Sequence, residues 1–188
     1  MKKKILSCTA ALFLSGCASQ SVSYFTLNQP QGATETVVKE ITSIVLVQSI
    51  EFPEYLTSRN IAVRTAANEL ELAEVHNWAE PFDVMVTNYL REQLHVGLKN
   101  TQIISSTRYA KPSLKIKMNI ICFEKNEQNN QVEFTARWWV LDGKTSSVVK
   151  EGLFTESLKP KDESYGSSAA THSLLLSQFS DYLIAELK

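Results

Sequence analysis

The 188-residue sequence is poor in the residues that build catalytic and metal sites, with three histidines, three cysteines and six glycines. The histidines lie far apart, and no His-x-x-x-His or Cys-x-x-Cys pair offers the ligand spacing of a metal site. A Gly-x-Ser-x-Gly motif and a glycine-rich phosphate loop are also missing. Glu69, Glu71 and Glu74 could be read as an acid–base pair, but such carboxylates on a strand usually form its solvated side. We therefore expect no enzyme, no catalytic residue, no metal and no non-covalent cofactor.

The N-terminus lacks an apolar run long enough for a transmembrane helix, which needs about 20 residues. Three lysines, a short apolar run and small residues are instead typical of a secretory signal peptide. The segment closes with Leu14-Ser15-Gly16-Cys17, which resembles the bacterial lipobox. The resemblance implies that residues 1–16 are removed and that Cys17 carries a diacylglycerol on its thiol and an acyl chain, such as palmitate, on its new N-terminus. The alternative is an ordinary cleaved signal in which Cys17 is incidental, or one in which Ala18 is the cleavage-site residue.

An excess of positive charge is also missing. Removal of residues 1–16 leaves 172 residues, with 16 basic and 20 acidic side chains and a net charge of −4. Such a domain has no electrostatic reason to bind nucleic acid or anionic headgroups, so the acyl chains must hold it to the membrane. The residue after the modified cysteine is Ala18 rather than Asp. By resemblance to enterobacterial sorting rules, this predicts the periplasmic face of the outer membrane.

Cysteine usage excludes a disulfide within the mature domain. Cys8 lies in the signal peptide and Cys17 is the expected lipidation site, so Cys122 remains alone. Its strand alternates apolar and polar residues, and Cys122 falls on the apolar side with Ile116, Met118 and Ile120. We therefore expect Cys122 to be buried, which makes a lone thiol tolerable in an oxidising compartment.

The pattern of apolar residues predicts a short tether at 17–36 and a single domain at 37–188. Strands are expected at 41–50, 103–104, 114–122, 132–141 and 146–158, with helices at 82–99 and 167–187. A β-hairpin is expected from 61–65 and 69–75, with Leu70 and Leu72 on its apolar side and Ala73 on the more solvated one. These elements predict an α/β fold: a mixed β-sheet with a β-hairpin insertion and two long helices packed on the sheet.

Three side chains are candidate partner contacts. Tyr55 and Leu56 follow a proline between two strands, where a loop on a firm scaffold can present contacts. Trp138 and Trp139 are adjacent on a strand, so their side chains point to opposite faces and one of them, Trp139 in our assignment, is the candidate contact. Packing in the core remains the alternative for all of them.

Four blocks of sequence together resemble the ABC-type transport auxiliary lipoproteins, the PqiC (YmbA) group. The blocks are Tyr24-Phe25-Thr26-Leu27, Phe52-Pro53-Glu54-Tyr55-Leu56, Arg59 through Arg64, and Trp78-Ala79-Glu80-Pro81-Phe82 with the helix that follows. The match in order and spacing covers about residues 14 to 98. Phe82 departs from the leucine that is usual in the family, but both residues are bulky and apolar.

The resemblance implies a non-enzymatic, outer-membrane lipoprotein subunit of an intermembrane lipid transport system of the MCE (PqiABC) type. Its partner would be a periplasm-spanning MCE-domain protein, and its role would include envelope integrity. A homo-oligomeric ring is expected if that partner is a ring, because matching symmetry repeats one contact. Two other classes of protein are the alternatives: a periplasmic lipid-binding shuttle or chaperone, which would need a large apolar cavity, and an envelope hydrolase, which would need a nucleophile and a base.

Overall fold

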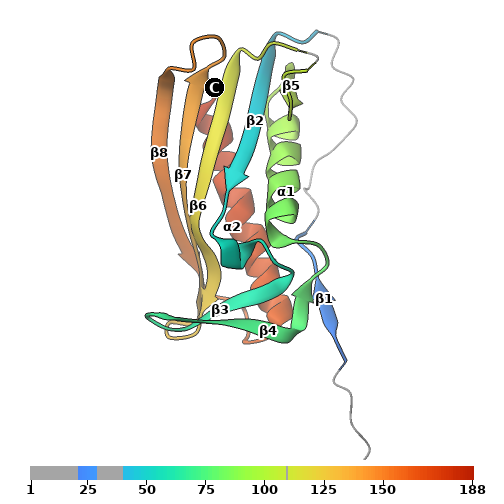
Figure 1. Cartoon of the computed structure of the whole chain (residues 1–188), viewed down its shortest axis with the longest axis vertical. Coiled ribbons are helices and arrows are strands. Elements are labelled where there is room, and N and C mark those ends of the chain that lie inside the picture. Colours follow the sequence, from blue (N-terminus) through green and yellow to red (C-terminus); the bar gives the residue numbers. More distant parts are fainter. Residues whose placement is uncertain (1–20, 29–39, 109) are drawn as a thin grey trace, which may run out of the picture.

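The computed structural model describes residues 21–28, 40–108 and 110–188, so the expected signal peptide and Cys17 lie outside the described residues. Over these ranges the chain forms one mixed sheet with two helices on it, which confirms the α/β fold class (Figure 1). In chain order the elements are β1 (Ser23–Phe25), β2 (Ser43–Glu51), the 3₁₀ turn η1 (Glu54–Leu56), β3 (Asn60–Ala66), β4 (Glu69–Trp78), α1 (Phe82–Gly97), β5 (Thr101–Ile104), β6 (Leu114–Asn126), β7 (Gln131–Asp142), β8 (Val148–Leu158) and α2 (Tyr165–Glu186).

The sheet is built around β6, the longest strand. β6 runs parallel to β2 over its first half, pairs with β3 at its end, and forms an antiparallel meander with β7 and β8. The strand order along the main path is β1-β4-β3-β6-β2-β5. The continuous apolar run in β2 is buried at Val45, Leu46 and Val47, and because successive strand residues point to opposite faces, side chains on both sides of β2 are shielded there.

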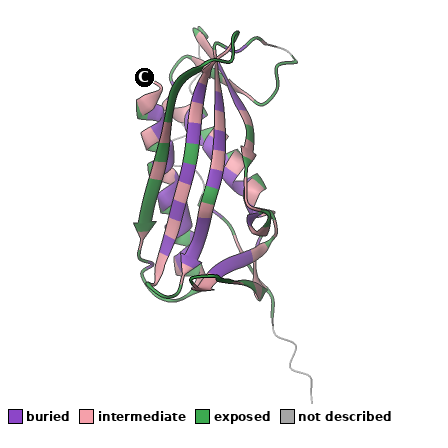
Figure 2. Cartoon of the chain, turned by 60° about the vertical axis from the view of Figure 1, so that its left-hand side comes forward, coloured by how far each residue is buried: buried purple, intermediate pink, exposed green. Residues whose placement is uncertain are grey.

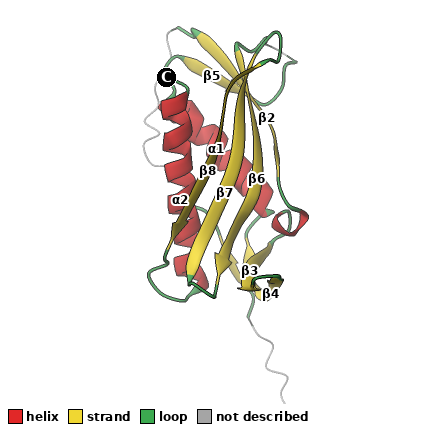
Figure 3. Ribbon diagram, turned by 90° about the vertical axis from the view of Figure 1, so that its left-hand side faces the viewer, coloured by secondary structure: helices red, strands yellow, loops and turns green. Residues whose placement is uncertain are grey.

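Both helices pack on the same face of the sheet, as Figures 1 and 3 show. Pro81 precedes α1 and Asp83 lies in its first turn, which suits the positive end of the helix dipole. α1 buries an apolar stripe that includes Phe82, Met85, Val86, Tyr89, Leu90 and Leu94, and α2 buries a second stripe beside it. The interior contains large side chains from every layer, among them Phe82, Leu90, Phe123, Phe134, Trp138, Leu175 and Phe179.

The prediction that Cys122 is buried with Ile116, Met118 and Ile120 is wrong. The pairing of β6 with β7 shifts at this point, so that Ile120 faces Ala136 while Cys122 faces Thr135. Ile121 is therefore the extra residue of a β-bulge. Beyond it the odd-numbered side chains of β6, rather than the even-numbered ones, point to the helix face of the sheet. Phe123 takes the buried position, Ile121 is 46% exposed, and Cys122 is half-buried on the other face of the sheet.

The predicted hairpin exists, but its sides differ from the prediction. β3 and β4 turn at Ala67-Asn68, between the two strands that the sequence predicts. Leu72, however, is 45% exposed, while Ala73 packs against the core. The pairing shifts between Asn60 and Ala62, and the Asn60 side-chain amide donates to the Ala73 carbonyl at 2.9 Å. This irregularity in the pairing changes which side chains of β4 face the core. A strict alternation of apolar and polar residues along the sequence therefore assigns them to the wrong sides.

Candidate functional site

The face of the sheet opposite the helices is the main candidate for an interaction surface. Neither α1 nor α2 covers this face, and Figure 2 shows buried positions alternating mainly with intermediate ones, and in a few places with exposed ones, along β6 and β7. Cross-strand pairing places two rows of side chains there, with Lys117 and Glu151 flanking Trp139 and with Asn119 and Leu153 flanking Arg137. We call the open face the surface formed by Lys117, Asn119, Ile121, Arg137, Trp139, Glu151 and Leu153.

The open face mixes apolar and charged side chains. Leu153 is 55% exposed and Ile121 is 46% exposed. They belong to β8 and β6, which are separated by β7. Lys117 lies over the Trp139 ring at 5.7 Å from its centroid and forms an ion pair with Glu51 at 3.1 Å. Exposed apolar side chains rimmed by charges are typical of a surface that binds another protein.

The two tryptophans point to opposite faces, as their adjacency predicts. Trp138 is 2% exposed, and its ring packs edge-on against Tyr182 of α2 at 5.8 Å. Trp139 is half-buried on the open face. The structure thus places the candidate contact Trp139 on the side of the sheet that the helices leave free.

The other two candidate contacts, Tyr55 and Leu56, differ in how far the structure buries them. Leu56 is 3% exposed and belongs to the core, so its burial contradicts a role as a surface contact in this conformation. Tyr55 is half-buried and its hydroxyl donates to Oε2 of Glu124 at 3.0 Å. Burial beside the Glu124 carboxylate raises the pKa of Tyr55, so its hydroxyl stays protonated as a donor.

Glu124 is the centre of a buried polar network that the sequence did not predict. Its side chain is 1% exposed, and Arg64 donates to Oε1 from Nε at 3.1 Å and from Nη2 at 2.7 Å. The Phe123 amide donates to Oε2 at 2.8 Å. The hydrogen bond to Glu124 raises the pKa of Arg64. Because Arg64 and Glu124 are 60 residues apart, only the pairing of β3 with β6 brings them together.

The histidines do not form a metal site in the described part of the chain, where no group of three or more His, Cys, Asp or Glu side chains converges. His172 is buried among Trp78, Phe82 and Phe123, with ring centroids 5.4, 5.7 and 4.9 Å away. Its Nδ1 lies 2.8 Å from the Ser168 carbonyl oxygen. Burial lowers the pKa of His172 to about 4, so the ring is neutral at physiological pH. His172 is therefore a core residue, and Phe82 contributes to its enclosure.

The family model for the ABC-type transport auxiliary lipoprotein component matches residues 25–183. No significant match is found among curated proteins. Within the described ranges, neither helix is both long and apolar enough to cross a bilayer.

Three solved structures share the fold. A crystal structure described only as an uncharacterized protein has a TM-score of 0.76 at 16% identity and covers 90% of this chain and 100% of its own. Protein XCC0632 from Xanthomonas campestris, of the DUF330 family model, has a TM-score of 0.70 at 17% identity, with 86% of this chain and 92% of its own covered. The hypothetical protein CT253 from Chlamydia trachomatis has a TM-score of 0.52 at 10% identity, with coverages of 77% and 95%.

Proposed function

Because the chain belongs to the ABC-type transport auxiliary lipoprotein family, we propose that it is the outer-membrane-anchored subunit of an MCE-type lipid transport system. In this proposal it docks the periplasm-spanning MCE-domain protein, supports envelope integrity and performs no catalysis. The observation that carries the proposal is the family match, which extends from β1 to the last turns of α2. An auxiliary component acts by binding, and the open face offers a surface for it.

The proposed anchor is Cys17, carrying diacylglycerol and an N-terminal acyl chain. Buried acyl carbons contribute about 0.8 kcal/mol each, so several chains hold a protein firmly where one chain is marginal. Cys17→Ser is expected to abolish lipidation and leave uncut precursor. Metabolic labelling with a fatty acid measures this directly, and label retained on Cys17→Ser would contradict the anchor. Fractionation of the labelled protein between inner and outer membranes tests the sorting expected from Ala18.

The proposed docking surface is the open face, and its proposed occupant is the MCE-domain partner. Ile121 and Leu153 expose apolar area that the helices do not cover, and Trp139 lies on the same face between Lys117 and Glu151. Interfaces are enriched in tryptophan and in exposed apolar side chains with a polar surround. A ring of copies of this chain would present the same face repeatedly if the partner is a ring.

Co-purification from solubilised membranes tests this assignment. A charge introduced on the open face by Leu153→Glu is expected to reduce recovery of the partner without changing the melting temperature. Leu174→Glu is the matched control, because Leu174 on α2 is 53% exposed and Leu153 is 55% exposed. Equal recovery with wild type, Leu153→Glu and Leu174→Glu would show that the open face is not the docking surface. Failure of the wild-type lipoprotein to recover any MCE-domain protein would contradict the proposed function itself.

A further inference from the structure

The edge of the sheet beside α1 is incomplete. β5 pairs with β2 only from Ser43 to Leu46, although β2 continues to Glu51. Among the described residues, no strand pairs with the outer side of β5 or with the corresponding side of β2 beyond Leu46. Unpaired backbone groups at a sheet edge are a template for another extended chain.

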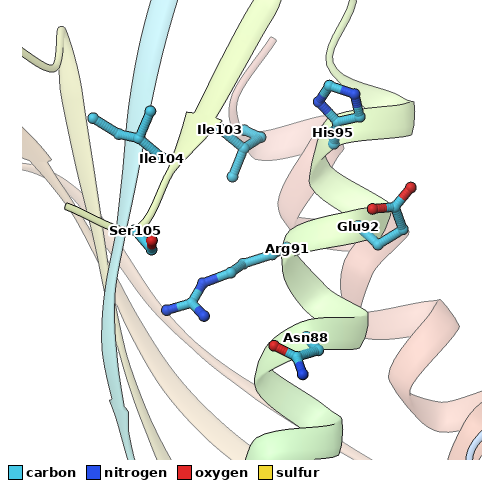
Figure 4. Close-up of a pocket in the computed structure, with 7 residues that line it drawn as sticks. All are labelled: Asn88, Arg91, Glu92, His95, Ile103, Ile104 and Ser105. Atoms are coloured by element: carbon cyan, nitrogen blue, oxygen red, sulfur yellow. The ribbon is translucent and has the colours of Figure 1, made fainter. Parts of the chain in front are cut away.

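A groove runs along this edge between β5 and α1. It has a volume of about 510 Å³ and is lined by Asn88, Arg91, Glu92, His95, Ile103, Ile104 and Ser105 (Figure 4). Asn88, Arg91 and His95 recur at helical spacing, so they form a polar stripe on one side of α1. Ile103 and Ile104 supply the apolar part of the groove from β5.

Arg91 is the distinctive residue of the groove. Figure 4 shows its side chain extending from α1 toward Ser105 at the end of β5, with Asn88 on the same side. Its Nε is buried, and the described residues offer it no hydrogen-bond acceptor. None of the ion pairs in the described part of the chain includes Arg91, and the Glu92 carboxylate points away from its guanidinium in Figure 4. Burial lowers the pKa of Arg91, because no nearby carboxylate compensates for the lost hydration.

We propose that this groove is a second binding site, which takes an extended peptide segment of a partner protein and pairs its carboxylate with Arg91. The peptide backbone adds to the outer edge of β5. Ile103 and Ile104 contact its apolar side chains, while Asn88 and Ser105 offer further hydrogen bonds. A guanidinium binds a carboxylate through two parallel hydrogen bonds, which suits a half-buried arginine with an unused Nε.

A peptide fits this groove better than a lipid does. An edge strand recognises backbone amides, which a phospholipid does not have. Acyl chains would need an apolar pocket, whereas five of the seven lining residues are polar or charged. The groove and the open face are separate surfaces, so this inference holds whether or not the open face docks the transport component.

The test uses full-length lipidated protein in detergent and a phage-displayed library of seven random residues with free C-termini. Selected peptides are synthesised in three forms: with a free C-terminal carboxylate, with a C-terminal amide, and with Asp and Glu replaced by Asn and Gln. Comparison of their affinities shows whether the protein binds the terminal carboxylate or a side-chain carboxylate. Neutralising the carboxylate that is bound is expected to weaken binding by about tenfold or more, since hydrogen bonds to charged groups are strong. Arg91→Met is expected to weaken it similarly, whereas Arg59→Met, at an exposed arginine just before β3 and outside both the groove and the open face, leaves it unchanged.

Strand addition has its own readout. Binding is expected to slow amide hydrogen exchange in Thr101–Ile104. No selected peptide, unchanged binding to a stably folded Arg91→Met variant, or binding without slower exchange in β5 would each overturn the proposal. Arg91-dependent binding of phosphatidylglycerol vesicles in place of peptides would assign the site to lipid headgroups instead and would equally overturn it.

Discussion

Single residues explain how the 3₁₀ turn η1 is held against the sheet. Glu124 receives hydrogen bonds from Tyr55, Arg64 and the Phe123 amide, so its buried charge is compensated from several elements. A buried carboxylate that is fully hydrogen-bonded imposes one arrangement on the groups around it, and losing a donor leaves it undercompensated. Tyr55 therefore positions η1, whereas Leu56 fills the core beneath it.

Substitutions at these two positions separate their roles. Leu56→Ala is expected to lower stability by about 2–5 kcal/mol, a fall in melting temperature of about 5–15 °C for a domain of this size. Tyr55→Phe keeps the ring but removes one donor to Glu124, with an expected loss of about 1–3 kcal/mol. Thermal unfolding followed by circular dichroism measures both. A Leu56→Ala variant that melts like wild type would contradict the burial of Leu56.

His172 makes stability depend on pH in a direction that follows from its burial. Its pKa falls from an ordinary 6.5 to about 4 in the folded domain, so only the unfolded chain takes up a proton between these values. The folded state therefore loses stability as pH falls from about 6.5 to about 4, by up to about 3 kcal/mol. Well above pH 6.5 the histidine is neutral in both states and contributes no pH dependence.

The comparison variant is His172→Gln, which cannot titrate. The free energy of unfolding of His172→Gln is expected to lie below that of wild type by an amount that shrinks as pH is lowered from 7 to 4.5. The reason is that only the wild-type chain takes up a proton at this position on unfolding, which destabilises its folded state at low pH. Urea unfolding at each pH measures the difference, with carboxylate titration common to both proteins. A difference in unfolding free energy that stays constant with pH would exclude His172 as the source.

At the scale of elements, the bulge at Ile121 decides which side chains of β6 face the helices. Before the bulge the even-numbered residues Ile116, Met118 and Ile120 are buried, and after it Phe123 is buried instead. The bulge also turns Cys122 toward Thr135 on the side of the open face. Burial raises the pKa of the Cys122 thiol, which leaves less of the reactive thiolate at neutral pH.

Thiol labelling tests the phase of β6. In the folded protein, Cys122 is expected to react with a maleimide more slowly than in urea but measurably, because it is half-buried rather than enclosed. Ile120→Cys in a Cys122→Ala background is the matched control, since Ile120 is fully buried and is expected to be protected far more strongly. Equal protection at the two positions would contradict the bulge.

Two glycines give a second test at this scale. A Cβ on Gly152 of β8 would meet the Trp138 ring at 2.7–2.9 Å, whereas a Cβ on Gly166 of α2 would have its nearest neighbour at 3.8 Å. Gly152→Ala is expected to cost about 1–3 kcal/mol through overpacking. Gly166→Ala is expected to be neutral or to stabilise α2 by up to about 1 kcal/mol, because alanine favours helix. A Gly152→Ala variant that melts at a higher temperature than the Gly166→Ala variant would contradict the packing of β8 against Trp138.

At the scale of the whole molecule, the two ends of the domain lie at different distances from the proposed anchor. β1 enters at the end where β3 and β4 lie, and the β7–β8 turn lies at the other end (Figures 1 and 3). The residues from Cys17 to Ser23 can span at most about 20 Å. Lipidation of Cys17 would therefore hold the β3–β4 hairpin near the bilayer and direct the β7–β8 turn into the periplasm.

A fluorophore placed at each end tests this orientation. Asn68→Cys lies in the β3–β4 turn and Thr145→Cys in the β7–β8 turn, and each is labelled in a Cys122→Ala background. Quenching by spin-labelled lipids in vesicles is expected for Asn68→Cys and not for Thr145→Cys. Equal quenching at both positions would mean that the domain lies flat on the membrane, contrary to the expectation.

Local patterns in the sequence determined the element types, the single α/β domain and the two helix stripes, because each depends on residues close together in the chain. The same holds for the Ala67-Asn68 turn and for the opposite directions of Trp138 and Trp139. The tertiary structure alone decided which residue of β6 forms a bulge, which carboxylate pairs with Arg64, and that Leu56 is core. It also decided that β5 leaves an open edge beside Arg91. These features depend on strand register and on contacts across 60 or more residues, which no local periodicity encodes.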